Sequence, residues 1–115
     1  MTFDDNLGMY AEEIDGVIFV FEDEPEEGFE EQIQPIANNY WCNLSHIIEF
    51  MMSDLEEVYE PIDAEIVKKK LGRPFIDFNN GRVDYLEQSF DSIHIFTFEF
   101  LDDEFKELQY FSIDG

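Results

Sequence analysis

The stretch MYAEEIDGVIFVF, residues 9–21, decides the fold that this sequence predicts. Its Asp15-Gly16 pair separates two runs of strand-forming residues, Met9–Ile14 and Val17–Phe21. An Asp-Gly pair between such runs is a strong signal for a two-residue hairpin turn, because both turn residues need a positive φ. The second run is apolar at every position, which is typical of an interior strand buried on both faces. We therefore expect a hairpin whose second strand lies inside a sheet.

Two segments with helical spacing follow the hairpin. In the first, the apolar residues that recur three or four positions apart are Phe29, Ile33, Ile36 and Tyr40. Pro35 falls inside this pattern and predicts a kink or a break near Gln34. In the second segment, the apolar stripe consists of Leu44, Ile47, Ile48, Met51, Met52, Leu55, Val58 and Tyr59. Such a stripe predicts an amphipathic helix that packs against the sheet, and Pro61 ends it.

A short third helix is expected over residues 64–71, with Asp63 as its cap and Gly72 as its end. From Phe75 the apolar period becomes two. Strands are expected over 75–78, 82–86, 93–100 and 108–113, the first two joined by the turn Asn79-Asn80-Gly81. The apolar stripe of a helix and the apolar face of a sheet must each be buried against another element. The predicted fold is therefore α+β: a single domain, 1–115, with an antiparallel sheet of about five to six strands and two or three helices packed on one face.

The composition is strongly acidic but not that of a disordered chain. The 115 residues include 29 acidic and 6 basic side chains, for a formal charge of -23. At 44% hydrophobic and 17% aromatic, the chain has enough apolar side chains for a packed core. The charge is uneven, because 19 of the acidic residues and no Lys or Arg precede Lys68.

This charge and the chain's N-terminal sequence limit the partners and the compartment. Nucleic acids and anionic membranes carry the same sign as this protein, so neither is an expected partner. The longest unbroken apolar run, Val17–Phe21, is far shorter than the ~20 residues that span a bilayer. Residues 1–6 lack the features of a signal peptide, and the single Cys42 cannot form an internal disulfide. A cytoplasmic location is expected.

The densest acidic segment is the candidate binding site. So many like charges in a small domain repel one another and destabilise the compact state, so folding alone does not explain them. General solubility or a halophilic habitat is one interpretation, and a surface for a cationic partner is the other. The predicted partner-binding residues are Glu22, Asp23, Glu24, Glu26, Glu27, Glu30 and Glu31.

No catalytic residue, metal ligand or cofactor is predicted. The segment 23–34 departs from a calcium loop at Pro25 and at Gln34, where a bidentate Glu is required. Cys42 and His46 supply only two potential ligands, and His94 is the other histidine. We expect a buried Cys42 thiol and histidines that serve as caps or core residues.

In size, acidity and possession of one cysteine, the chain resembles bacterial immunity proteins of toxin–immunity systems, including contact-dependent growth inhibition. Its C-terminal half resembles small bacterial domains of unassigned function, from Gly72-Arg73-Pro74 through Asn80-Gly81 to Ser112-Ile113-Asp114-Gly115. The resemblance implies an inhibitor of one cognate toxin and transfers no residue roles.

Three functions remain open. The first is a non-enzymatic acidic binding protein that neutralises a basic partner, an immunity protein whose carboxylates cover the Lys- and Arg-lined cleft of a nuclease-type toxin. The second is a DNA mimic that inhibits a DNA-binding protein, which requires carboxylates at the spacing of duplex phosphates. The third is a small enzyme, which requires a concave site containing Cys42, His46 or His94.

Overall fold

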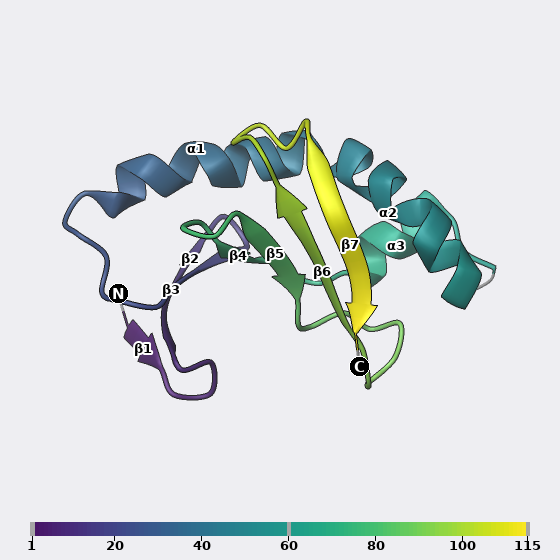
Figure 1. Cartoon of the computed structure of the whole chain (residues 1–115), viewed down its shortest axis with the longest axis horizontal. Helices are drawn as coiled ribbons and strands as arrows, with labels where there is room; N and C mark the ends of the chain where they lie inside the picture. The colour runs from purple at the N-terminus through teal and green to yellow at the C-terminus, as the bar shows by residue number, and fades with distance from the viewer. Residues whose placement is uncertain (1, 60, 115) are drawn as a thin grey trace.

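The computed structural model describes residues 2–59 and 61–114, and shows three helices against one sheet (Figure 1). The elements in chain order are β1 (Thr2–Asp4), β2 (Met9–Ile14), β3 (Val17–Phe21), α1 (Phe29–Cys42), α2 (Leu44–Val58), α3 (Ala64–Lys70), β4 (Phe75–Asp77), β5 (Arg82–Tyr85), β6 (Ile95–Phe100) and β7 (Leu108–Asp114). The fold is α+β, as the sequence predicts, with seven strands rather than five to six.

The strand order in the sheet is the order in the chain, β1 to β7. Neighbouring strands are antiparallel except β3 and β4, which are parallel with Ile18 opposite Phe75. The expectation of a wholly antiparallel sheet is therefore wrong at this one joint. The chain leaves β3, runs through all three helices and re-enters beside β3 in the same direction, and such a crossover produces a parallel pair.

The strand that the sequence did not predict is β1. It has three residues, too few to show a period of two, and it pairs with β2 through a turn fixed by Asp4. The Asp4 Oδ1 atom accepts hydrogen bonds from the backbone N–H groups of Asn6 (2.9 Å) and Leu7 (3.2 Å). A carboxylate that bonds its own backbone two or three residues ahead is a local turn-former.

The hairpin at Asp15-Gly16 is confirmed. Ile14 pairs with Val17 across the turn, and both turn residues have positive φ, 52° for Asp15 and 80° for Gly16. All five residues of β3 are buried, with β2 on one side and β4 on the other. The strand is therefore interior, as its continuous apolar run predicts.

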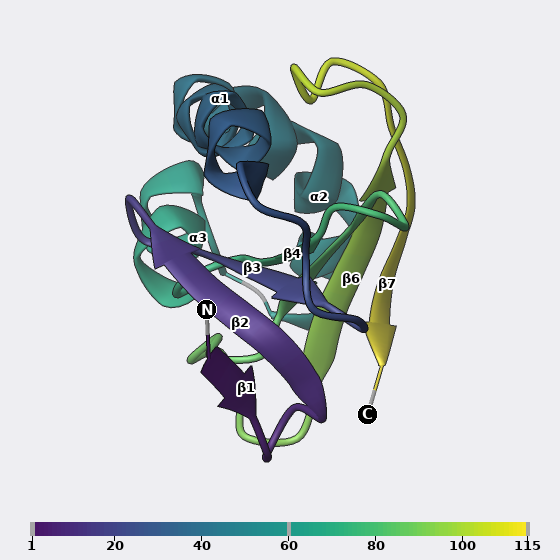
Figure 2. The same ribbon diagram turned by 90° about the vertical axis from the view of Figure 1, so that its left-hand side faces the viewer.

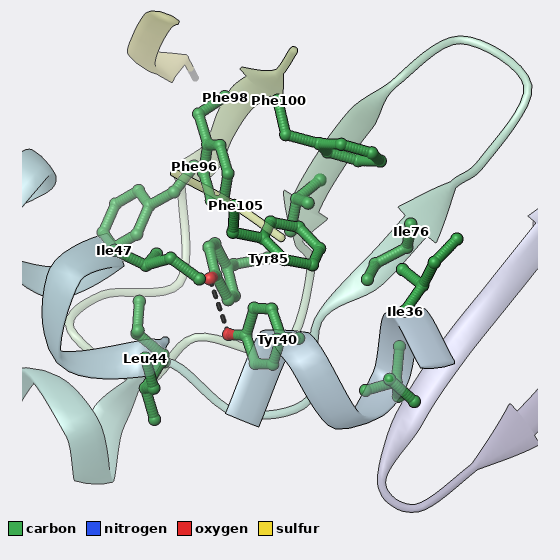
Figure 3. Packing of buried hydrophobic residues seen from close by; sticks show 14 of the residues in the cluster. Ile36, Tyr40, Leu44, Ile47, Ile76, Tyr85, Phe96, Phe98, Phe100 and Phe105 are labelled. Atoms are coloured by element: carbon green, nitrogen blue, oxygen red, sulfur yellow. Dashed lines mark hydrogen bonds between the residues drawn. The ribbon is translucent and has the colours of Figure 1, made fainter. Parts of the chain in front are cut away.

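The three helices lie together on one face of the sheet (Figure 2). The buried residues of α1 and α2 are Ile33, Ile36, Ala37, Tyr40, Leu44, Ile47, Ile48, Met51 and Leu55. They form one core with the inward side chains of the strands, which include Phe19. Figure 3 shows part of this core, with Ile76, Phe96 and Phe98 from the strands. Of the stripe predicted for α2, Met52 and Tyr59 are partly buried and Val58 is 52% exposed, whereas the other five residues are buried.

Pro35 does not end α1, so the break predicted near Gln34 does not occur. A proline inside a helix removes one backbone N–H and leaves the carbonyl four residues earlier without its partner. Pro35 is exposed, whereas Ile33 and Ile36 on either side of it in the helix are buried. Packing of this apolar face against the sheet holds the helix together across the missing hydrogen bond.

A polar contact lies inside the aromatic core. The hydroxyl groups of Tyr40 on α1 and Tyr85 on β5 are 2.7 Å apart and hydrogen-bonded, with both side chains fully buried (Figure 3). Burial raises the pKa of both phenols above the usual value. The pair thus joins the helical layer to the sheet through neutral groups that satisfy each other.

We expect Tyr40→Phe or Tyr85→Phe alone to lower the free energy of unfolding by about 1–3 kcal/mol, because each leaves the other buried hydroxyl without a partner. The double variant should lose less than the sum of the two single losses, since no unpaired hydroxyl remains. Urea unfolding of the four proteins measures this coupling. Strictly additive losses would contradict the assignment of this hydrogen bond.

Candidate partner-binding site

The acidic segment connects β3 to α1, at one end of the helical layer (Figure 1). Its two ends are held by aromatic packing, because the rings of Phe21 and Phe29 meet edge to face with centroids 5.7 Å apart. Gly28 has a φ of 87° and provides the turn into α1. These contacts fix where the segment enters and leaves the domain.

All seven predicted partner-binding residues are exposed: Glu22, Asp23, Glu24, Glu26, Glu27, Glu30 and Glu31. Four of them, Asp23, Glu24, Glu26 and Glu27, line one hollow of about 280 Å³. Glu30 and Glu31 lie in the first turn of α1, where the positive end of the helix dipole favours carboxylates. Glu22, Glu30 and Glu31 do not line the hollow.

Two amide side chains complete the hollow, and the sequence did not indicate either. Gln32 comes from α1 and Asn79 from the turn between β4 and β5. Asn79 is remote in the chain and reaches this place only because β4 pairs with β3. Carboxylate and amide oxygens accept hydrogen bonds from ammonium and guanidinium groups, so the hollow suits a Lys or Arg side chain.

The chain supplies little compensation for this negative charge. Within residues 2–59 and 61–114, the ion pairs are formed by Arg73, Arg82, His94 and Lys106, and none involves the seven carboxylates. The acidic segment therefore presents a negative electrostatic potential to solvent, and an external cation can neutralise it.

The prediction of a buried Cys42 is wrong. Cys42 is exposed at the end of α1, two positions after the buried Tyr40. Two positions turn a helix by about 200°, which places the thiol on the solvent side. His46 is also exposed, with its Nε2 atom 3.0 Å from the carbonyl oxygen of Lys106, whereas His94 lies in a separate cluster.

That second cluster consists of Tyr59, Asp91 and His94. The Tyr59 hydroxyl donates to Asp91 Oδ2 at 2.5 Å, and His94 Nδ1 lies 2.6 Å from the same oxygen. The Gln88 amide donates to the carbonyl oxygens of Asp91 (3.1 Å) and His94 (2.8 Å). These bonds tie the loop before β6 to the end of α2. No local pattern in the sequence indicates a contact between residues this far apart in the chain.

The hydrogen bond from Tyr59, with those from His94, holds the pKa of Asp91 well below its usual range. Burial and the bond to Asp91 raise the pKa of Tyr59. A carboxylate on Nδ1 orients an imidazole, as in many catalytic sites. In the described part of the chain, however, no Ser, Thr or Cys side chain is hydrogen-bonded to His94. The hydrogen bonds of Asp91 to Tyr59 and His94 anchor the loop before β6.

Among the residues that the structure describes, no three His, Cys, Asp or Glu side chains converge as metal ligands. The helices of the same residues are all too short or too polar to cross a bilayer. No protein-family model, curated protein or solved structure matches the chain.

We expect Asp91→Asn to lower the melting temperature more than Asp103→Asn, which removes an equal charge from an exposed side chain. A lowered pKa in the folded state stabilises the protein fully above the ordinary Asp pKa of about 3.9, and this contribution disappears as the pH falls toward the folded value. The melting-temperature gap between wild type and Asp91→Asn should thus be present at about pH 5 and narrow below about pH 4. Thermal unfolding across this range measures it, and a gap that persists undiminished at about pH 2 would contradict the role of Asp91.

Proposed function

We propose that this protein is a non-enzymatic acidic binding protein that neutralises a basic protein partner. The observation that carries the proposal is a group of seven exposed carboxylates, none of them in an ion pair in the described residues. Five lie on the segment between the packed rings of Phe21 and Phe29, and Glu30 and Glu31 follow in the first turn of α1. The like-charge repulsion among these carboxylates lowers the stability of the folded protein. A cationic surface that docks against them relieves this repulsion, which favours binding.

The partner class that best fits this surface is a nuclease-type toxin, and the chain would act as its immunity protein in the bacterial cytoplasm. A nuclease cleft carries Lys and Arg side chains to hold phosphates. Carboxylates that line a hollow at the end of α1 can occupy those side chains in place of phosphates and exclude the nucleic acid. Long-range attraction between the two surfaces also speeds their encounter, which suits an inhibitor that must act before the toxin does.

We expect association with a cationic probe to be electrostatically steered through the acidic segment. A 20-residue poly-L-arginine is a suitable probe, and its association rate should fall at least about tenfold between about 20 and 500 mM NaCl. Neutralising six carboxylates by Glu→Gln or Asp→Asn should slow association further at low salt. The six are Glu22, Asp23, Glu26, Glu27, Glu30 and Glu31.

A matched control neutralises six exposed carboxylates elsewhere: Glu49, Asp54, Glu56, Glu57, Glu65 and Glu107. The two variants have the same net charge, so a larger loss of rate in the first locates the binding site. Equal rates for the two variants in stopped-flow measurements would contradict the proposed site. Both variants should unfold at a higher temperature than wild type, because each relieves like-charge repulsion.

The immunity assignment has its own test. The toxin should be encoded immediately upstream of this chain, and co-expression of the chain should restore growth that the toxin arrests. Failure of the chain to protect, together with competition against duplex DNA for a DNA-binding protein, would favour the DNA-mimic interpretation instead.

A further inference from the structure

A second hollow lies on the face of the sheet that no helix covers. Side chains alternate between faces along a strand, so Ile18 and Phe75 point away from the helices when Phe19 and Ile76 point toward them. The groove above Ile18 and Phe75 has a volume of about 880 Å³. That volume exceeds one side chain and suits a short peptide segment.

The groove has an apolar floor and apolar walls. Ile18, Val20 and Phe75 form a small cluster of their own, with Leu7, Met9 and Ala11 packed against it. Phe3 of β1 lines the groove and remains 46% exposed, and Leu86, after β5, also lines it and is 40% exposed. Two large apolar side chains are thus left open to solvent on one concave surface, which is typical of an interaction site.

Carboxylates surround this apolar surface: Asp4, Asp5, Glu13 and Glu87. Arg73 is the one basic residue that lines the groove, and it bridges two of them. Its Nη1 atom lies 2.8 Å from Glu13 Oε2, and its Nη2 atom lies 2.6 Å from Glu87 Oε2. Glu13 belongs to β2 and Glu87 follows β5, so one guanidinium joins strands on either side of β3 and β4.

In this internal contact, both carboxylate oxygens of Glu87 accept hydrogen bonds from the Arg73 guanidinium, which is the bidentate geometry that arginine favours. Carboxylates of the groove can therefore hold a guanidinium. Asp5 has no ion pair within the described residues. One acidic position beside the apolar walls is therefore open to a cation from outside, and the single Arg73 leaves the lining negative.

We infer that this groove binds an extended segment of a basic protein partner, with an apolar side chain between Phe3 and Leu86 and an Arg or Lys side chain at Asp5. The inference rests on the proposed function for the sign of the partner's charge, but it uses a different face and different carboxylates. A second copy of this chain is a poor occupant, because each copy carries a formal charge of -23. Apolar contact at the centre and charge at the rim is the usual arrangement of a protein–protein interface.

Two synthetic octapeptides test the inference, one alternating Arg with Leu and the other alternating Arg with Ser. They share charge and length, so a difference in affinity reports the apolar contact. We expect the Arg–Leu peptide to bind at least about fivefold more tightly, about 1 kcal/mol at 25 °C. In NMR titrations followed by ¹H–¹⁵N correlation spectra, the Arg–Leu peptide should shift the amide resonances of residues 3–7, 11–13 and 86–87.

Matched variants locate the site. Leu86→Ser should abolish the preference for the Arg–Leu peptide, whereas Leu101→Ser, at an exposed leucine outside the groove, should leave it intact. Asp5→Lys should weaken binding more than Glu57→Lys, an identical change of charge on α2. Equal affinity for both peptides, or equal effects of the two leucine variants, would overturn the inference.

The groove and the acidic segment can be judged separately. In the variant with six carboxylates neutralised on the acidic segment, both peptides should bind more weakly while the preference for Arg–Leu persists. If that variant binds both peptides as wild type does, the result contradicts the acidic segment as a binding site but leaves the inference about the groove unaffected. If sedimentation shows a dimer that Leu86→Ser converts to a monomer, the occupant is a second copy and the inference about a basic partner is wrong.

Discussion

The structure depends on one constraint, which is that β3 has no polar side chain and must be covered on both faces. The helices cover the face that carries Phe19, and the residues around the β1–β2 turn cover the face that carries Ile18. Burial on both sides also requires a hydrogen-bonded neighbour at each edge, because an uncovered backbone group in an apolar setting is unfavourable. β2 provides one neighbour through the tight hairpin, and β4 provides the other only after the helical crossover.

The same constraint separates the apolar and charged parts of the molecule. Because the helices and strands direct their apolar side chains into one core, the excess carboxylates collect on the connecting segment, on the solvent side of α2 and around the open face of the sheet. The charge that opposes folding is thereby kept at the periphery, where water screens it. A partner can also reach the charge at the periphery. The two proposed binding sites differ because the groove combines carboxylates with exposed apolar side chains, whereas the acidic segment presents mainly carboxylates.

The sequence predicted correctly the elements that depend on interactions between residues close together in the chain. The Asp15-Gly16 turn, the stripe of α2 and the strand at Val17–Phe21 each depend on a few neighbouring residues, and the structure has all three. The parallel joint of β3 and β4 depends on a contact between Ile18 and Phe75, which no local pattern encodes. For the candidate site, exposure of the acidic residues followed from their charge, but the hollow needs Asn79, and the anchor at Asp91 needs the distant Tyr59.

The strand order has a consequence for how the chain assembles during synthesis. Strands that join the sheet in the order in which they leave the ribosome can each add to an edge that already exists, with short loops to close. The exception is β4, which has to find β3 across the whole helical segment, so the edge of β3 stays open until residues 75–77 have emerged. An exposed apolar strand edge is an aggregation hazard. In the folded protein α1 covers the face of β3 that carries Phe19 and Phe21, but the open edge of β3 is paired only once β4 has arrived.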